Sequence, residues 1–259
     1  MPIHSINNLD IFVDQFGDGI PVLALHGLGG SSNFWWPLHA ALPNGLKVIA
    51  PDMPSSGRSA NDPALSISSL AANMLSLMDA LGLEQAHLLG HSMGTIVCQH
   101  IAVNEPDRVL SLALLGPLAE PPEPARPNIA SRAELARTQG MQPISDAIIG
   151  AALAEKTKTE KPVTTAFVRE LVAAQDAEGY ALSCLALAEA KAADVTQLTC
   201  PTVLITGEED KVAPPLNVDA LGANFGTAVS PIMLEDCGHW TLLEQPLLTA
   251  THLKSFYGI

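Results

Sequence analysis

The stretch Leu88-Leu89-Gly90-His91-Ser92-Met93-Gly94 decides how this chain folds. A short apolar run, typical of a buried strand, leads directly into Gly-x-Ser-x-Gly, and a helical pattern follows over residues 93–104. Such a sharp strand-to-helix turn strains the backbone of its serine, and only glycine or another small residue fits beside it. We therefore predict that Ser92 presents a free hydroxyl at the N-terminus of a helix, where the helix dipole favours negative charge.

Strand and helix patterns alternate on both sides of this turn. Strands are predicted at 3–7 and 11–16, which form a hairpin, and at 21–25, 47–50, 86–89, 109–115, 201–206 and 229–234. Helices are predicted at 33–42, 67–81, 93–104 and 241–256. Continuous apolar strands that alternate with helices predict an α/β fold with a mostly parallel central sheet and helices on both faces.

The composition changes in the middle of the chain. Five prolines between residues 117 and 127 exclude a regular helix or a central strand there. Residues 131–194 then show helical patterns at about 131–139, 143–155, 162–177 and 179–191, and no convincing strand. We predict a helical cap over residues 118–196, inserted between two parts of an α/β core at 1–117 and 197–259.

The composition excludes several classes of partner. The 259 residues carry a net charge of −14, which repels nucleic acid and anionic membrane surfaces. No apolar run approaches the roughly 20 residues that span a bilayer, and no secretory signal is visible. The four cysteines are scattered without a C-x-x-C motif, so we expect a cytoplasmic protein with no metal site and no cofactor. Its oligomeric state does not follow from the sequence.

A serine hydroxyl needs a base within reach, and the base needs a carboxylate that orients it. Gly207-Glu208-Glu209-Asp210 follows one predicted buried strand, and Cys237-Gly238-His239-Trp240 follows the last. Both loops leave the carboxyl ends of strands, which is where open parallel sheets hold their active sites. We predict Ser92 as the nucleophile, His239 as the general base and then acid, and Asp210 as the orienting carboxylate.

Other residues compete for two of these roles. Glu208 and Glu209 flank Asp210, and Asp236 lies three residues before His239, so each is an alternative carboxylate. The neighbour of the serine, His91, is expected to pack against nearby loops and not to act as the base.

A tetrahedral intermediate also needs hydrogen-bond donors on its oxyanion, and fixed backbone N–H groups serve well. We predict that the N–H groups of Met93 and Leu28 supply them. Leu28 lies in His26-Gly27-Leu28-Gly29-Gly30, whose glycines let the loop bend towards the pocket. His26 is expected to support this loop by hydrogen bonding.

The chain resembles the α/β-hydrolase fold superfamily over nearly its full length. Five motifs carry the resemblance in the family's order and approximate spacing: His26-Gly27-Leu28-Gly29-Gly30, Pro51-Asp52, Gly90-His91-Ser92-Met93-Gly94, Gly207-Glu208-Glu209-Asp210 and Gly238-His239. The stretch 132–141 and Gly179-Tyr180 further resemble the 3-oxoadipate enol-lactonase branch, which hydrolyses a small lactone carrying a carboxylate. Two positions depart from the family pattern, because Ser55 and Thr95 stand where many members have glycine.

The resemblance implies a serine hydrolase that cleaves carboxylic esters of small to medium acyl chain through an acyl-enzyme. A lactonase of the enol-lactonase type and a carbon–carbon bond hydrolase are alternatives, and a small-molecule receptor is the non-enzymatic one. We expect the pocket between sheet and cap, with wall residues drawn from Leu28, Trp35, Trp36, Met93, Trp240 and Leu243. Few cationic residues can be placed near it, and Arg58 is expected to be solvated. The pattern therefore favours a neutral ester over an anionic lactone.

Overall fold

A single sheet of eight strands organises the part of the chain that the structure, a computed structural model, describes, namely residues 3–42 and 45–259. The strands are β1 (Ile3–Ile6), β2 (Leu9–Gly17), β3 (Gly19–Leu25), β4 (Gly45–Pro51), β5 (Ala86–His91), β6 (Val109–Leu115), β7 (Thr202–Gly207) and β8 (Ile232–Leu234). Their order is β1-β2-β4-β3-β5-β6-β7-β8. Strand β2 pairs antiparallel with β1 and β4, and all other neighbours are parallel. The predicted mostly parallel sheet is confirmed.

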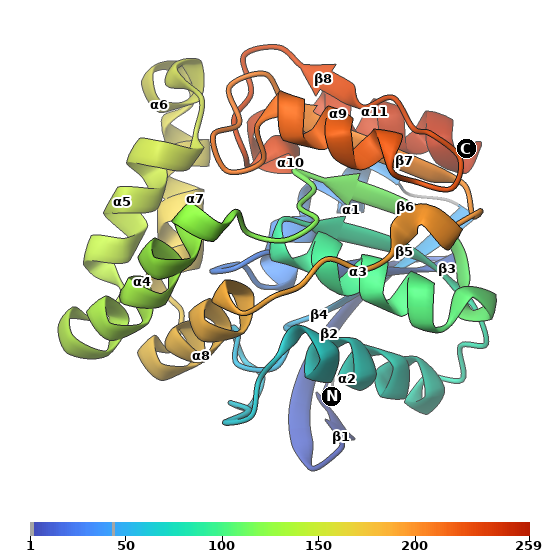
Figure 1. Cartoon of the computed structure of the whole chain (residues 1–259), viewed down its shortest axis with the longest axis horizontal. Helices are drawn as coiled ribbons and strands as arrows, with labels where there is room; N and C mark the ends of the chain where they lie inside the picture. Colours follow the sequence, from blue (N-terminus) through green and yellow to red (C-terminus); the bar gives the residue numbers. More distant parts are fainter. Residues whose placement is uncertain (1–2, 43–44) are drawn as a thin grey trace.

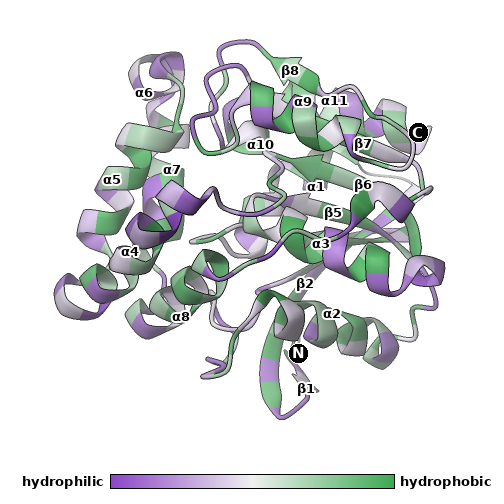
Figure 2. Ribbon diagram, viewed as in Figure 1, coloured by the Kyte–Doolittle hydropathy of each residue, from purple (hydrophilic) through white to green (hydrophobic). Residues whose placement is uncertain are grey.

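Helices cover both faces of this sheet (Figure 1). The α-helices that cover the two faces are α1 (Pro37–Ala41), α2 (Ile67–Ala80), α3 (Met93–Asn104), α9 (Pro215–Ala223), α10 (Thr241–Glu244) and α11 (Pro246–Tyr257). In Figure 1 α3 lies in front of the strands, and α1 and α11 lie behind them. Apolar residues are concentrated in the strands, between the helices of the two faces, and in α3 (Figure 2). No helix in the described ranges is long and apolar enough to cross a membrane.

Five further helices lie between β6 and β7 in the chain, and we call them the helical insert. They are α4 (Arg126–Gln139), α5 (Gln142–Ala152), α6 (Glu155–Glu160), α7 (Pro162–Ala173) and α8 (Ala177–Ala188). They form one group beside the sheet, on the left in Figure 1, with α4 packed on α8 and α5 on α7. The exclusion of helix from the proline-rich segment was wrong at its end, since α4 begins at Arg126. Pro127 is tolerated in the first turn because an N–H there would have no partner within the helix.

Some predicted boundaries were wrong. The helix predicted at 241–256 is interrupted, since α10 ends at Glu244 and α11 starts at Pro246, which cannot donate to the preceding turn. The helix predicted at 33–42 is divided in the same way, into a 3-10 turn, η1 (Ser32–Trp35), and α1. The hairpin turn lies at Asn7 and Asn8, with φ of 50° and 66°, values that asparagine tolerates.

Candidate active site

The turn between β5 and α3 holds Ser92 in a strained conformation, with φ 51° and ψ −120°. A Cβ on Gly90 would lie 2.8 Å from the carbonyl oxygen of Gly94, and a Cβ on Gly94 would collide with the carbonyl oxygen of Leu25. Both positions therefore require glycine for space. A non-glycine residue at positive φ persists only where its surroundings fix it, which is typical of functional sites.

Thr95 secures the turn from behind. Its hydroxyl donates to the carbonyl oxygen of Ser92 at 2.6 Å and accepts the N–H of Leu118 at 3.1 Å. The threonine that departs from the family pattern thus ties the serine to the segment that follows β6.

His239 and Asp210 meet at the carboxyl ends of β7 and β8. The Nδ1–H of His239 donates to Oδ2 of Asp210 at 2.8 Å, and both side chains are buried. The other oxygen of Asp210 accepts the N–H groups of Val212 at 2.8 Å and Ala213 at 2.7 Å. Burial alone would raise the pKa of Asp210, but His239 and these N–H groups outweigh it, so the pKa lies below its ordinary value. Asp210 is therefore held as a carboxylate against the imidazole.

The competing carboxylates lie elsewhere. Asp236 points to solvent and pairs with Lys156 at 2.6 Å. Glu209 is exposed and accepts the N–H of Glu155 at 3.1 Å, and Glu208 is exposed as well. Among the described residues only Asp210 bonds to the imidazole of His239.

The second ring nitrogen of His239, Nε2, is not bonded to Asp210. This nitrogen is buried and has no hydrogen-bond partner in the described part of the chain. Ser92 and His239 line the same cavity. An imidazole with an unpaired nitrogen that lines the same cavity as a strained serine can act as base towards its hydroxyl once substrate is bound.

His91 is buried between these residues. Its ring stacks on Phe34 with centroids 4.3 Å apart, and its Nε2–H donates to the carbonyl oxygen of His239 at 3.0 Å. Burial, and then the neighbouring His239, lower the pKa of His91 to about 3, so the ring stays neutral. As the sequence predicts, His91 packs against a loop. Phe34 carries no sequence signal for this contact beyond its place after the glycine-rich loop.

The glycine-rich loop after β3 reaches the serine. A Cβ on Gly27 would lie 2.8 Å from the Cβ of Ser92, so only glycine allows this approach. Leu28 lines the cavity beside Ser92. Within the described ranges, neither the N–H of Leu28 nor that of Met93 donates to a protein acceptor. These are the two donors that the sequence assigns to an oxyanion.

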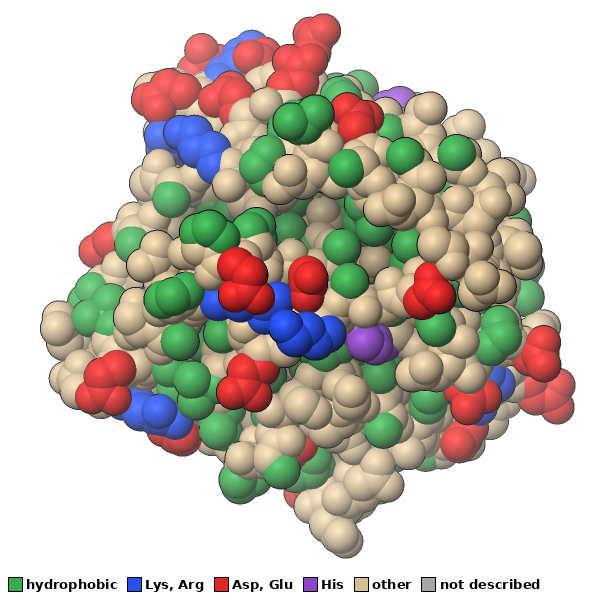
Figure 3. Space-filling view, in the orientation of Figure 1, with side chains coloured by type: hydrophobic (Ala, Val, Ile, Leu, Met, Phe, Trp, Pro, Cys, Tyr) green, Lys and Arg blue, Asp and Glu red, His purple; other side chains and the backbone are tan. Residues whose placement is uncertain are grey.

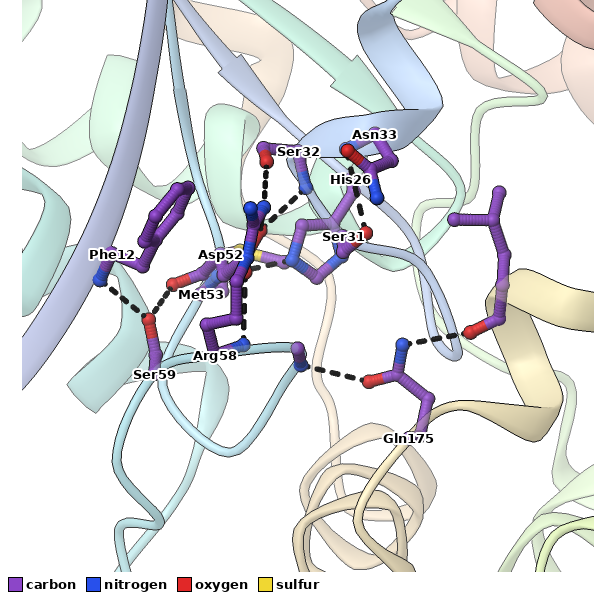
Figure 4. A network of polar contacts seen from close by, with 12 residues as sticks. Phe12, His26, Ser31, Ser32, Asn33, Asp52, Met53, Arg58, Ser59 and Gln175 are labelled. Atoms are coloured by element: carbon purple, nitrogen blue, oxygen red, sulfur yellow. Dashed lines mark hydrogen bonds and ion pairs between the residues drawn. The ribbon is translucent and has the colours of Figure 1, made fainter. Parts of the chain in front are cut away.

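A buried polar network holds this loop (Figure 4). The carboxylate of Asp52 accepts the N–H of Ser32 at 2.6 Å and the Nε–H of Arg58 at 2.8 Å. Burial would raise the pKa of Asp52, but the hydrogen bonds from Arg58 and Ser32 lower it overall. The Arg58 side chain stays 46% exposed, as expected from the sequence, while it pairs with the buried Asp52, and its guanidinium lies 3.4 Å from the ring centre of Phe12.

His26 links the same loop to the turn after β4. Its Nε2 accepts the N–H of Met53 at 3.0 Å, so its Nδ1–H donates to the carbonyl oxygen of Gly27 at 2.9 Å. The expected supporting role of His26 agrees with this geometry. On the far side of the turn, Gln175 of the insert accepts the N–H of Gly57 at 2.9 Å.

A cavity of about 370 Å³ opens between the sheet and the insert. This volume lies at the small end of the range for ligand sites. The sheet side and its loops contribute Leu28, Ser92, Leu118, Pro121, Pro122, Lys211, Val212, Pro214, Asn217, His239 and Trp240. The insert and the turn before it contribute Ala125, Asn128, Ile129, Arg132, Ile148, Ala152 and Leu187.

The predicted wall was only partly right. Leu28 and Trp240 line the cavity, but Trp35, Trp36, Met93 and Leu243 do not. Trp35 is buried in the core against Phe34, and Trp36 is 54% exposed and stacks on His39. Met93 and Leu243 are buried in the core. The cavity residues at 128, 129 and 132 in α4, and at 125 just before it, were missed, although their spacing of three and four marks one helical face.

The cavity wall holds two cations, Arg132 and Lys211, which agrees with the expectation of few, although neither was named from the sequence. Arg132 is half-buried, and among the described residues it alone of the six arginines has no carboxylate within 4 Å. Lys211 lies on the opposite, sheet side. Elsewhere on the surface basic side chains lie beside acidic ones (Figure 3), as Arg126 does with Glu120 at 2.9 Å. An arginine in a cavity wall that has no carboxylate partner is suited to an anionic ligand.

Comparisons with known proteins agree with this fold. The family model described as alpha/beta hydrolase fold matches residues 20–246. A thermophilic esterase from Thermogutta terrifontis with malate bound is 26% identical, with a TM-score of 0.93 over 99% of this chain and 97% of that one. The enol-lactonase from Burkholderia xenovorans LB400 is 25% identical, with a TM-score of 0.93 over the whole of both chains.

A curated relative matches a shorter segment. The putative carbamate hydrolase RutD of Azorhizobium caulinodans is 36% identical over 116 residues, which are 44% of each chain. The chain thus aligns with less than half the length of this relative.

Proposed function

This chain belongs to the α/β hydrolase fold family, and we propose that it is a serine hydrolase that cleaves small carboxylic esters through an acyl-enzyme intermediate. One observation carries the proposal. The imidazole of His239 is bonded to Asp210 through Nδ1, its Nε2 has no partner in the described residues, and His239 and the strained Ser92 line the same cavity. The esterase and the enol-lactonase among the similar structures support the same class of reaction.

In the proposed reaction Nε2 of His239 removes the hydroxyl proton of Ser92 as Oγ attacks the ester carbonyl carbon. The N–H groups of Leu28 and Met93 stabilise the oxyanion. The tetrahedral intermediate then breaks its bond to the alcohol, which leaves with the proton from His239. Water, activated by the same imidazole, attacks the acyl-enzyme and releases the acid and the free serine. Asp210 keeps Nδ1 protonated and stabilises the imidazolium throughout.

Initial rates on p-nitrophenyl esters from acetate to dodecanoate, with wild type and Ser92→Ala, test this proposal. The wild type should turn over the short esters fastest, because the cavity measures about 370 Å³. Ser92→Ala should lose nearly all of this activity while folding normally. Equal rates for the two proteins would overturn the role of Ser92. A folded wild type without activity on any ester would favour a carbon–carbon bond hydrolase or a small-molecule receptor.

The unpaired Arg132 favours a second candidate, a lactone or ester that carries a carboxylate. Arg132 and Lys211 line the cavity from opposite sides, so an anionic substituent would meet a cation on either wall. The similarity to an enol-lactonase and to an esterase with malate bound agrees with such a substrate.

Arg132→Met distinguishes the neutral ester from the anionic one. With the mono-p-nitrophenyl ester of glutaric acid, the variant should show a KM raised about tenfold or more, because a charge-assisted hydrogen bond to a carboxylate is lost. With p-nitrophenyl butyrate its kinetics should stay near those of wild type. Arg169→Met, which removes a surface partner of Asp146, is the matched control and should affect neither substrate. Equal effects of Arg132→Met on both substrates would exclude a carboxylate-binding role.

A further inference from the structure

Glu244, at the end of α10, carries a carboxylate that is completely buried. Within the described ranges no Lys, Arg or His nitrogen lies within 4 Å of it. Its oxygens accept hydrogen bonds instead. Oε1 accepts the N–H of Trp240 at 3.0 Å, and Oε2 accepts the N–H of Ala154 at 2.8 Å and the hydroxyl of Thr157 at 2.9 Å.

These bonds join two parts of the molecule that are far apart in the chain. Trp240 follows His239 directly, whereas Ala154 and Thr157 belong to the insert, at the junction of α5 and α6. A further bond runs beside them, from the N–H of His239 to the carbonyl oxygen of Ala152 at 2.8 Å. The histidine loop is therefore held against the insert by its own backbone.

The histidine loop and the insert are closely packed at this junction. A Cβ on Gly238 would lie 2.6 Å from the carbonyl oxygen of Ala152 and 2.9 Å from Oε1 of Glu244. The loop that carries His239 thus packs backbone to backbone on the insert, and the carboxylate of Glu244 fixes both sides of the contact.

We propose that Glu244 is a positioning residue, which sets the place of the His239 imidazole by holding its loop against the insert. The inference rests on the proposed function, because it takes His239 as the proton-transfer residue. Small misplacement of such a group weakens the protonation of the leaving group. Esters with a poor leaving group need that proton, whereas p-nitrophenolate leaves without it.

Glu244→Gln is a sharp test because no orientation of the amide satisfies the site. Each carboxylate oxygen accepts one fixed backbone N–H, from Trp240 or from Ala154. The amide has one oxygen, so its NH₂ group must face one of these donors in either orientation. A buried donor that faces another donor loses its hydrogen bond and repels its neighbour.

The first measurement compares kcat/KM for an ethyl ester and a p-nitrophenyl ester of the same short acid. In Glu244→Gln the value for the ethyl ester should fall by about 10- to 100-fold, within the range that general acid–base catalysis supplies. The value for the p-nitrophenyl ester should fall several-fold less. Thr157→Val, which removes one donor on the insert side, should show the same selectivity to a smaller degree and covers the case in which Glu244→Gln fails to fold. Equal losses on the two esters would overturn the proposal.

The second measurement, hydrogen exchange, does not depend on activity. Amides of residues 236–243 and 152–158 should exchange faster in Glu244→Gln or in Thr157→Val than in wild type. The matched control is Asn73→Ala. Asn73 is a buried residue of α2 that accepts a hydrogen bond from Asn7, and its loss should leave exchange in those two segments unchanged. Unchanged exchange in both junction variants would overturn the positioning role. If wild type lacked Ser92-dependent activity while exchange responded as expected, the proposed function would fail and the junction would stand.

Discussion

His91 donates its Nε2–H to the backbone carbonyl oxygen of His239 at 3.0 Å, so the residue beside the serine holds the loop of the predicted base. The two rings lie 5.0 Å apart and tilted, and the ring of His91 is buried. A protonated His91 would place a second positive charge beside the imidazolium that forms during the proposed reaction. A neutral His91 therefore avoids charge repulsion with the imidazolium that His239 forms in the proposed reaction.

The burial of His91 predicts acid sensitivity. In the unfolded chain its pKa is the ordinary 6.5, whereas in the folded protein it is about 3. The unfolded chain alone takes up this proton between those values, so the stabilisation is complete above pH 6.5 and is lost as the pH falls. Between pH 6.5 and pH 5 the loss should be about 2 kcal/mol from this group. Urea denaturation across this range should show it, and His91→Gln should flatten the curve relative to wild type. Parallel curves for the two proteins would rule out the effect.

The carboxylate that orients the imidazole can be identified by a matched pair. Asp210→Asn should lower kcat by about three orders of magnitude or more, because an amide no longer stabilises the correct tautomer or the imidazolium. Asp236→Asn removes only a surface partner of Lys156 and should leave kcat unchanged. Steady-state rates on a short p-nitrophenyl ester measure both variants. A large loss in Asp236→Asn with little in Asp210→Asn would reverse the assignment.

Two glycine-to-alanine substitutions test whether the glycine at the serine turn is required by lack of space. One is at the turn, and the other is at an open position in the insert. Gly94→Ala places a Cβ against the carbonyl oxygen of Leu25 and should cost about 3 kcal/mol or more of folding free energy. Gly150→Ala, in α5, meets no atom within 4 Å and should gain about 0.5–1 kcal/mol from helix propensity. Urea midpoints give both values. Similar midpoints for the two variants would contradict the close packing of the turn.

The Asp52 network predicts a further pH effect. Asp52 has a pKa below its ordinary 3.8, so it stabilises the protein above that value and the stabilisation is lost as the pH falls through the folded pKa. Arg58→Met removes the main cause of this shift. It should cost about 1–3 kcal/mol at neutral pH, a range reduced because Arg58 is partly exposed. It should also move the acid-unfolding midpoint to higher pH, as circular dichroism can follow. An unchanged midpoint would contradict the role of this pair.

The positions of Ser92, Asp210 and His239 could be predicted because each follows a parallel strand. Strands that are buried on both faces have a plain apolar signature, and their carboxyl ends meet at one edge of the sheet whatever the details of packing. The glycines around Ser92 added a local steric argument that the structure bears out. Chain order and local sequence were therefore sufficient for this part.

The cavity wall could not be predicted in the same way. Arg132 reaches the cavity because α4 packs on α8 and both lie over the carboxyl edge of the sheet, a long-range arrangement that no local pattern specifies. Trp35 and Trp36 were misplaced for the related reason that adjacent aromatic residues point in different directions. The final helix was predicted as continuous, but Pro246 interrupts it between α10 and α11.

The two sides of the cavity differ in how much change their packing allows, and this has a practical consequence for engineering. On the sheet side, Gly27, Gly94 and Gly238 have no room for an added Cβ. Substitutions there are therefore expected to give inactive protein. The face of α4 offers Asn128, Ile129 and Arg132, whose side chains line the cavity without belonging to the sheet. A library directed at these three positions would sample new substrate preferences at little risk to the reactive centre, and related proteins could diverge by the same route.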